Sequence, residues 1–138
     1  MPVITKYIAI STQGGCDILD ITPQVNKELK SLKIKDGIVN INVCGSTAGL
    51  TTCEYEPGLV KDLKEFFDKI IPRGRYHHDQ AWGDGNGHSH LRSSLIGTSI
   101  TVPFNNRELI LGTWQQIIFV DFDNRPRSRK IVLQFLGE

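Results

Sequence analysis

All four histidines of this 138-residue chain lie between residues 77 and 90, in a segment that also holds Asp79 and Asp84. Neutral imidazoles with a carboxylate form suitable sites for zinc or another divalent transition metal. A coordination position left open on such a metal would hold water or a phosphate oxygen. The glycines of the segment would let it fold tightly around a ligand. The segment is therefore a candidate metal site.

The spacing of His88 and His90 limits this interpretation. Two residues apart on one helix, their side chains would point about 200° away from each other. They could share one metal only if the helix begins after His88. Two alternatives stay open: histidines of an ordinary solvated loop, or histidines that act as acid, base or phosphate donor without a metal.

A second candidate is the small, polar segment 45–52, which includes Ser46 and Thr47. Small residues allow a ligand to approach the backbone, and hydroxyl and N–H groups can hold an anion. The segment lacks the Gly-Lys-Ser/Thr of a Walker motif, and a tight turn between two strands would explain it equally well. Glu54 could be a metal ligand or a general base, or it could join Glu56 as an acid at a helix N-terminus.

Aromatic and basic residues in the second half of the chain form a third candidate. Trp114 and Gln115 could stack on and hydrogen-bond a flat ligand, although a core tryptophan would look the same. All seven arginines follow residue 71, and Arg125, Arg127 and Arg129 lie close to a predicted turn. Arginine suits phosphate and carboxylate because its donors form a fixed fork, although arginines at such a turn are often simply solvated.

The pattern of the sequence also predicts the elements that position these residues. Apolar residues at helical spacing predict one helix that begins at Thr22, one over residues 57–71 and one over residues 87–96. A loop over residues 73–86 separates the last two. Strands at both ends with two to three helices between them predict a single α+β domain over residues 1–138 with a largely antiparallel sheet. β-Branched and aromatic residues place the strands at residues 3–10, 17–21, 38–43, 99–103, 108–111, 116–122 and 130–136.

Charge and composition argue against several classes of protein. With 16 Lys and Arg against 15 Asp and Glu, the net charge is +1, which makes nucleic-acid binding unlikely. No apolar run approaches the roughly 20 residues of a membrane span, and no secretory signal is visible. Three cysteines without a CxxC motif are typical of reduced thiols. We therefore expect a cytoplasmic protein with neither membrane nor nucleic acid as a partner.

In their order and spacing these motifs resemble the YjbQ family over nearly the whole chain. The segments that carry the resemblance are residues 46–54, 76–79, 86–91, 94–97, 111–117 and 127–130. The resemblance implies a compact α+β subunit with a mixed, barrel-like sheet, assembled as a homo-oligomer, either a trimer or a hexamer. It also implies a polar cleft between subunits, where histidine and glutamate side chains meet a metal or an anion.

Some members of this family are assigned a secondary thiamine-phosphate synthase activity, which joins a pyrimidine-methyl diphosphate to a thiazole phosphate and releases diphosphate. The resemblance therefore implies a small phosphorylated metabolite as ligand and a divalent metal, zinc or magnesium, as cofactor. Its catalytic positions match Glu54, His78 and His90 here. The residues that we expect to bind substrate are Ser46, Thr47, Asn86, Trp114, Gln115 and Arg127.

We expect the metal itself to be held by His78, Asp79, His88 and His90. Many members of the family have a histidine where this chain has Gly45, and His88, which many of them lack, is expected to take its place. The alternative to an enzyme is a non-catalytic homo-oligomer that binds a metal or a phosphorylated metabolite in the same polar cleft.

Overall fold

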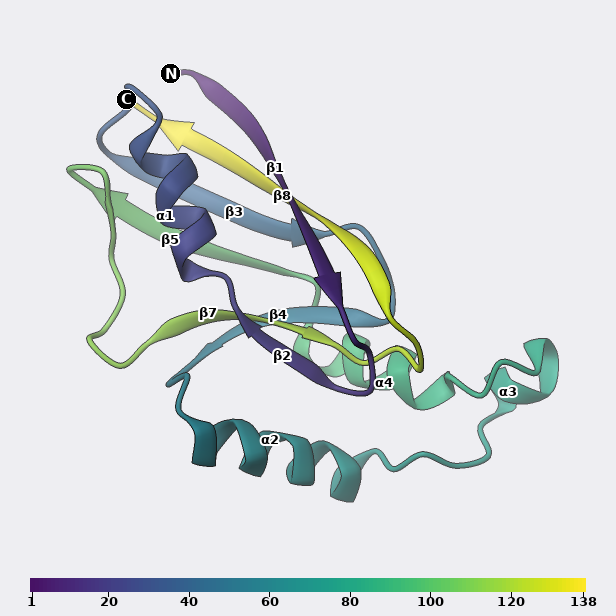
Figure 1. The fold of residues 1–138 in the computed structure, drawn as a ribbon. Helices are drawn as coiled ribbons and strands as arrows, with labels where there is room; N and C mark the ends of the chain where they lie inside the picture. The colour runs from purple at the N-terminus through teal and green to yellow at the C-terminus, as the bar shows by residue number, and fades with distance from the viewer.

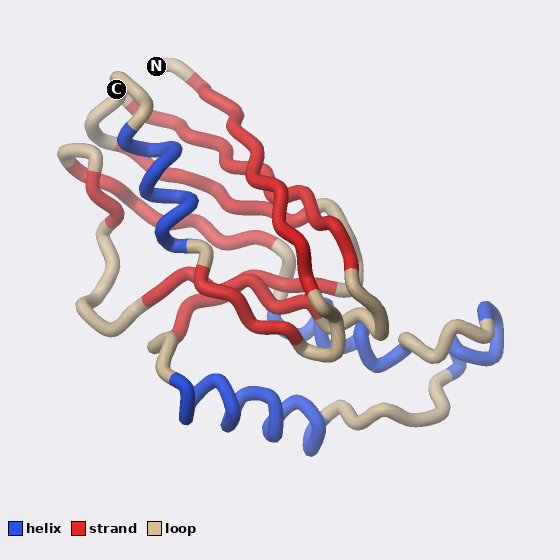
Figure 2. The backbone as a smooth tube through the Cα atoms, viewed as in Figure 1, coloured by secondary structure: helices blue, strands red, loops and turns tan.

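The computed structural model describes all 138 residues and contains two antiparallel sheets (Figure 1). The strand order of the larger sheet is β1 (Val3–Thr12), β8 (Arg127–Gly137), β3 (Gly37–Val43), β5 (Ser99–Asn105) and β6 (Glu108–Leu109). The order of the smaller sheet is β2 (Asp17–Asp20), β7 (Gln116–Asp121) and β4 (Ala48–Cys53). All neighbouring strands run antiparallel. Figure 2 shows that the strands curl into an open half-barrel.

Four helices complete the fold: α1 (Thr22–Lys30), α2 (Pro57–Ile70), α3 (His77–Trp82) and α4 (Gly87–Ile96). Helix α1 lies beside the larger sheet, and its Val25 and Leu29 belong to the main core. Helices α2 and α4 lie beneath the smaller sheet, and α3 projects beyond the sheets at one end of the molecule (Figure 1). None of the four helices is long and apolar enough to cross a membrane.

Strand β7 is the central strand of the smaller sheet, and it is buried on both of its faces. Ile117 and Phe119 pack into the main core under the larger sheet. Ile118 and Val120 point the other way, toward Phe67 of α2. Each such side chain contributes about 1.5–3 kcal/mol by leaving water. The strand therefore fixes the position of the segment that follows it, which carries much of the candidate site.

The helix over residues 57–70 begins where its sequence predicts. The carboxylate of Glu56 accepts hydrogen bonds from the N–H groups of Gly58 and Leu59, both at 2.7 Å, and Pro57 occupies the first helical turn. These two bonds hold the pKa of Glu56 below its ordinary value. Of the predicted apolar stripe only Phe67 is buried, and Phe66 remains 51% exposed. Glu56 is thus the N-cap of α2, in agreement with its interpretation as an acid at a helix N-terminus.

The fold class and most elements agree with the sequence-based predictions. Helix α4 spans the predicted residues 87–96, and Gly97, with a φ of 89°, follows its end. One local prediction was wrong: the segment predicted to be a loop contains the short helix α3. Residues 44–47 form a short connection between β3 and β4, as one interpretation of segment 45–52 proposed, and from Ala48 onward the segment is strand β4, which pairs with β7.

Candidate functional site

Helix α4, which carries His88 and His90, lies directly against β4. A Cβ atom on Gly49 would overlap the side chain of Ile96, so only glycine allows this approach. Ser93 donates a hydrogen bond of 2.6 Å to the carbonyl oxygen of Ala48 and ties the two elements together. The small residues of segment 45–52 therefore allow a helix to approach the strand. The sequence pattern had suggested that they allow a ligand to approach.

Asp79 joins the start of α3 to the start of α4. Its Oδ1 accepts a hydrogen bond of 2.8 Å from the N–H of Gly87, and its Oδ2 accepts one of 3.3 Å from the N–H of Tyr76. Burial raises the pKa of Asp79, but these two bonds and the neighbouring His78 outweigh that effect and hold the pKa below its ordinary value. Asp79 is therefore an anion at neutral pH.

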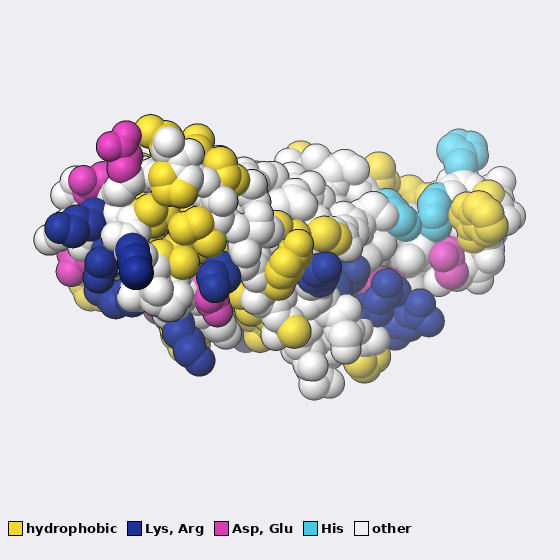
Figure 3. Space-filling view, turned by 90° about the horizontal axis from the view of Figure 1, so that it is seen from above, with side chains coloured by type: hydrophobic (Ala, Val, Ile, Leu, Met, Phe, Trp, Pro, Cys, Tyr) yellow, Lys and Arg dark blue, Asp and Glu magenta, His cyan; other side chains and the backbone are white.

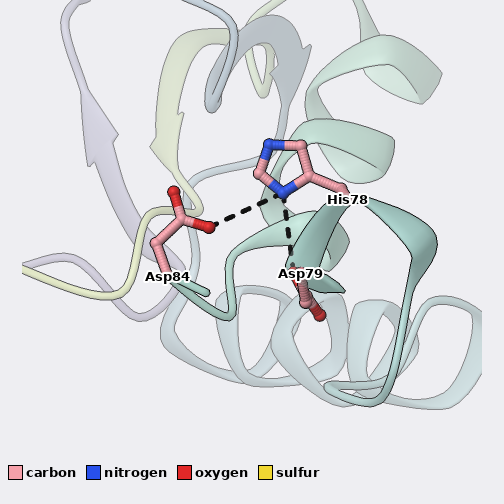
Figure 4. Close-up of side chains that lie close together, drawn as sticks. All are labelled: His78, Asp79 and Asp84. Atoms are coloured by element: carbon pink, nitrogen blue, oxygen red, sulfur yellow. Dashed lines mark ion pairs between the residues drawn. The ribbon is translucent and has the colours of Figure 1, made fainter. Parts of the chain in front are cut away.

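His78, Asp79 and Asp84 converge at this junction (Figure 4). His78 Nδ1 lies 3.5 Å from Asp79 Oδ1 and 3.7 Å from Asp84 Oδ1. It is buried and has no hydrogen-bond partner. The candidate ligand atoms of the three residues all lie within 4.8 Å of one another. One imidazole nitrogen and two carboxylates suit a divalent transition metal, so the residues present fit the metal that the resemblance implies.

The other two predicted metal ligands, His90 and His88, differ in their position relative to this cluster. The ring of His90 lies beside that of His78, with 4.4 Å between the ring centroids. His88 is only 3% exposed, and its Nε2 lies 3.4 Å from Arg73 Nε, away from the cluster. Because α4 begins at Gly87, both residues are helical and diverge as their spacing predicted. His88 therefore does not belong to the cluster, which instead includes Asp84.

Asp84 reaches the cluster because two glycines flank it. Gly83 and Gly85 have φ angles of 70° and 66°, in the left-handed region that favours glycine. Asp84 lies in the candidate metal segment, but it was not among the four residues expected to hold the metal. The Gly-Asp-Gly pattern after a short polar helix was the available signal for a carboxylate at a sharp turn.

A polar pocket of about 280 Å³ adjoins this cluster and shares Asp84 with it. Asp123 is one of the residues that line it. Asn86 Nδ2 and Arg127 Nη1 donate hydrogen bonds to Asp123 at 3.3 and 2.9 Å, and Thr47 Oγ1 donates another at 3.3 Å. Burial raises the pKa of Asp123, but its hydrogen bonds and the nearby arginines hold it below its ordinary value. Three of the six expected substrate-binding residues are thus brought together here, and Ser46 is an exposed residue next to Thr47.

A buried ion pair between Arg129 and Asp121 lies next to this pocket. Arg129 Nε and Nη2 each donate a hydrogen bond of 2.8 Å to Asp121, whose side chain is 0% exposed. Arg129 Nη2 also donates to Thr47 Oγ1 at 2.7 Å, and Thr12 donates to Asp121 at 2.6 Å. The network fixes Thr47 and the end of β7, and with them the position of Asp123. Figure 3 shows the histidines gathered at one end of the molecule near a group of Lys and Arg side chains.

Glu54, Trp114 and Gln115 lie at the opposite end of β4. In the β4–β7 pair Ala48 faces Asp121, whereas Cys53 faces Gln116, so Glu54 is one full strand length from Thr47. Glu54 and Trp114 line a pocket of about 420 Å³, in which Trp114 is 73% exposed. Gln115 Nε2 donates to Thr52 Oγ1 at 3.1 Å. Within one chain, these residues do not share a site with His78 and His90.

Comparison with known proteins identifies the family. The family model of UPF0047 protein YjbQ-like matches residues 6–138. The chain belongs to the YjbQ family. A UPF0047 protein of Archaeoglobus fulgidus is 38% identical to it, over 94% of this chain and 98% of the relative. The YjbQ-family protein YugU of Bacillus subtilis is 35% identical, over 96% of this chain and 98% of the relative.

Two solved structures have the same fold as this chain. A YbjQ-like protein of unknown function from Sulfolobus solfataricus superimposes with a TM-score of 0.93 at 32% identity, over 99% of both chains. A hypothetical protein from Aeropyrum pernix gives a TM-score of 0.91 at 34% identity, over 98% of this chain and 99% of the other. The α+β half-barrel is therefore the fold of the YjbQ family.

Proposed function

We propose that this YjbQ-family protein is a metal-dependent enzyme that acts on a small phosphorylated metabolite. The observation that carries the proposal is Asp84, which belongs both to the cluster with His78 and Asp79 and to the polar pocket with Arg127. A cation held by the cluster would therefore lie at the edge of a pocket whose donors suit phosphate oxygens. A condensation that releases diphosphate, as in thiamine-phosphate synthase, is the reaction that the family resemblance favours.

We assign the following roles in this reaction to residues of the chain. His78, Asp79 and Asp84 would hold the metal, which supplies positive charge to neutralise phosphate oxygens during transfer. Arg125 and Arg127 line the same pocket and would bind and orient the phosphate groups. His90, whose ring lies next to that of His78, would donate a proton to the departing diphosphate. Zinc or magnesium could serve, and the imidazole ligand favours zinc.

We further propose that a second copy of the chain completes the site. Glu54 and Trp114 lie at the far end of β4 within one chain, so only another subunit can bring them to His78. The pocket that holds them is open, and Trp114 is free to stack on a flat ring such as a pyrimidine. Glu54 would then accept a hydrogen bond from the amino group of the ring and so stabilise the positive charge that develops there as the bond to diphosphate breaks. A homotrimer or hexamer would provide such contacts, as the family resemblance implies.

A direct assay tests the enzymatic proposal. The protein is incubated with hydroxymethylpyrimidine diphosphate and thiazole phosphate, with and without added Zn²⁺ or Mg²⁺, and diphosphate release is measured. We expect release that requires both substrates and a metal. Asp84→Asn should lower the rate at least about 100-fold by weakening metal binding, whereas Asp62→Asn, an exposed control on α2, should leave it unchanged.

Two outcomes would contradict the proposal. Diphosphate release that is equally fast in Asp84→Asn would show that the cluster is not part of the active site. Tight binding of the phosphorylated substrates without any turnover would favour the alternative, a non-catalytic module that binds a metal and a phosphorylated metabolite.

A further inference from the structure

A third polar cavity, of about 230 Å³, lies where α2, α4 and the turn before β2 meet. It shares no residue with the pocket around Asp123 or with the metal cluster. Its lining is mainly polar and contains three cationic or potentially cationic side chains. The lining residues are Gly15, Asp68, Arg73, His88, Arg92 and Phe122.

Both arginines of this cavity are held rigidly and keep donors free. Arg92 is buried, and its Nε and Nη2 donate hydrogen bonds of 3.0 and 2.8 Å to the carbonyl oxygen of Ile71. Its Nη2 also contacts Asp68 at 3.2 Å. Arg73 uses Nε and Nη2 for His88 and Asn124. These contacts leave Nη1 of each guanidinium without a protein acceptor, and a held arginine loses little conformational entropy when it binds a ligand.

His88 holds the side chain of Arg73 at the cavity, and this contact fixes which nitrogen of the ring carries the hydrogen. A guanidinium N–H always carries its hydrogen, so His88 Nε2, 3.4 Å from Arg73 Nε, must accept. The hydrogen of the neutral ring is therefore on Nδ1, which is buried and has no partner. Burial, followed by the charges of Arg92 and Arg73, lowers the pKa of His88, in agreement with a neutral ring. His88 therefore contributes to the cavity as a neutral, buried side chain that accepts a hydrogen bond from Arg73.

We propose that Arg73, His88 and Arg92 form a binding site for a phosphate group, either free or as a phosphomonoester. The two guanidinium groups, each with an Nη1 that has no protein acceptor, match the acceptor oxygens of a tetrahedral dianion. The one carboxylate at the cavity, that of Asp68, is mostly exposed and already paired with Arg92. The net charge of the lining residues is therefore positive.

This site is distinct from the proposed metal cluster but connected to it by one side chain. Arg73 Nη2 donates a hydrogen bond of 2.6 Å to Asn124 Oδ1. Asn124 Nδ2 in turn donates to the carbonyl oxygens of Asp84 and Gly85 at 3.2 and 3.0 Å. Phosphate bound at Arg73 would therefore lie next to the loop that positions Asp84. The proposal does not depend on the enzymatic function, because none of its residues is assigned to that reaction.

Titration calorimetry with inorganic phosphate and with methyl phosphate, at constant ionic strength and pH 7.5, tests this site. Wild type is compared with Arg73→Gln and His88→Phe, with Arg127→Gln, which reports on phosphate bound in the pocket around Asp123, and with Arg75→Gln as a control outside both pockets. We expect the two cavity variants to weaken phosphate binding at this cavity by about tenfold or more, and Arg75→Gln to change it less than about twofold. Equal binding of methyl phosphate would identify a phosphomonoester as the ligand, and binding of inorganic phosphate alone would identify the free ion.

Residue-specific NMR of the His88 ring provides the second readout, since its resonances should shift during the phosphate titration. Arg73 is exposed, so Arg73→Gln should fold normally even if His88→Phe does not. Wild-type affinity in Arg73→Gln would overturn the proposal. So would the absence of binding by wild type at millimolar phosphate, or a loss of binding in Arg127→Gln but not in Arg73→Gln.

Discussion

Asp121→Asn should destabilise the protein by about 3 kcal/mol, because it removes the closer of the two carboxylates beside the buried guanidinium of Arg129 and leaves only Asp123, at 3.9 Å. The pair is fully enclosed, with Asp121 accepting two bonds of 2.8 Å from Arg129 and one of 2.6 Å from Thr12. An asparagine of the same shape keeps the packing but removes the charge. Urea unfolding followed by circular dichroism measures the change in the free energy of unfolding.

The matched control is Asp62→Asn, an exposed carboxylate on α2, which should change stability by less than about 0.5 kcal/mol. A loss below about 1 kcal/mol in Asp121→Asn would show that the pair contributes no more than a surface ion pair. The network around Thr47 would then not be the rigid base of the site that its geometry suggests.

The same pair predicts how stability depends on pH. Burial raises the pKa of Asp121, but the bonds from Arg129 and Thr12 outweigh it and hold the pKa below its ordinary value of 3.8. A carboxyl group whose pKa is lowered by folding stabilises the protein above its unfolded-state pKa, and this contribution is lost as the pH falls through the folded-state pKa. Wild type should therefore lose stability steeply below about pH 4, and Asp121→Asn should lose less over the same range.

Mixing two inactive variants should restore activity if the site is formed between subunits. Glu54→Gln and His78→Ala should each lower diphosphate release by at least about 100-fold. Heteromers of the two contain some sites in which an intact Glu54 from one subunit meets an intact His78 from another. Random assortment gives this pairing in about one site in four, so co-refolded mixtures should recover about a quarter of wild-type activity.

His78→Ala mixed with Asp84→Asn is the control, because both changes affect the same cluster of one chain. That mixture should show no recovery beyond its components. Failure of the Glu54→Gln and His78→Ala mixture to recover, with mixed oligomers verified by mass, would contradict a shared site. Full activity of Glu54→Gln alone would remove Glu54 from the mechanism.

Elements with strong local patterns were predictable from the sequence. Strand β3 alternates as expected, with Val39 and Ile41 buried and Asn40 outside the core. Helix α4 matched its predicted range because Gly97 ends it. The divergence of His88 and His90 followed from helix geometry alone.

Elements fixed by tertiary contacts were not predictable. Strand β4 is short and polar, and it is a strand because β7 pairs with it and α4 covers Gly49. Helix α3 has only six residues, and Asp79 anchors it through bonds to the backbone of Tyr76 and Gly87. An isolated helix of that length is unstable in water. Strands β4 and β7 are far apart in the sequence, so local patterns do not indicate that they pair.

The candidate site shows the same division. The sequence pattern identified the histidine segment, but it could not show that His78 lies in the metal cluster whereas His88 lies at the cavity with Arg73. Asp84 joins His78 only because of the backbone turn at Gly83 and Gly85. The distance between Glu54 and His78 follows from the direction in which β4 runs, and strand direction within a sheet is a property of the whole fold.

Metal analysis is the most direct test of the central claim that His78, Asp79 and Asp84 form a metal site. Wild type, His78→Ala, Asp84→Asn and the exposed control His77→Gln are loaded with zinc, dialysed and analysed by inductively coupled plasma mass spectrometry. We predict about one zinc ion per chain in wild type and in His77→Gln, and little or none in the other two variants. Folded wild-type protein without bound metal, or equal metal in His78→Ala and Asp84→Asn, would contradict the account.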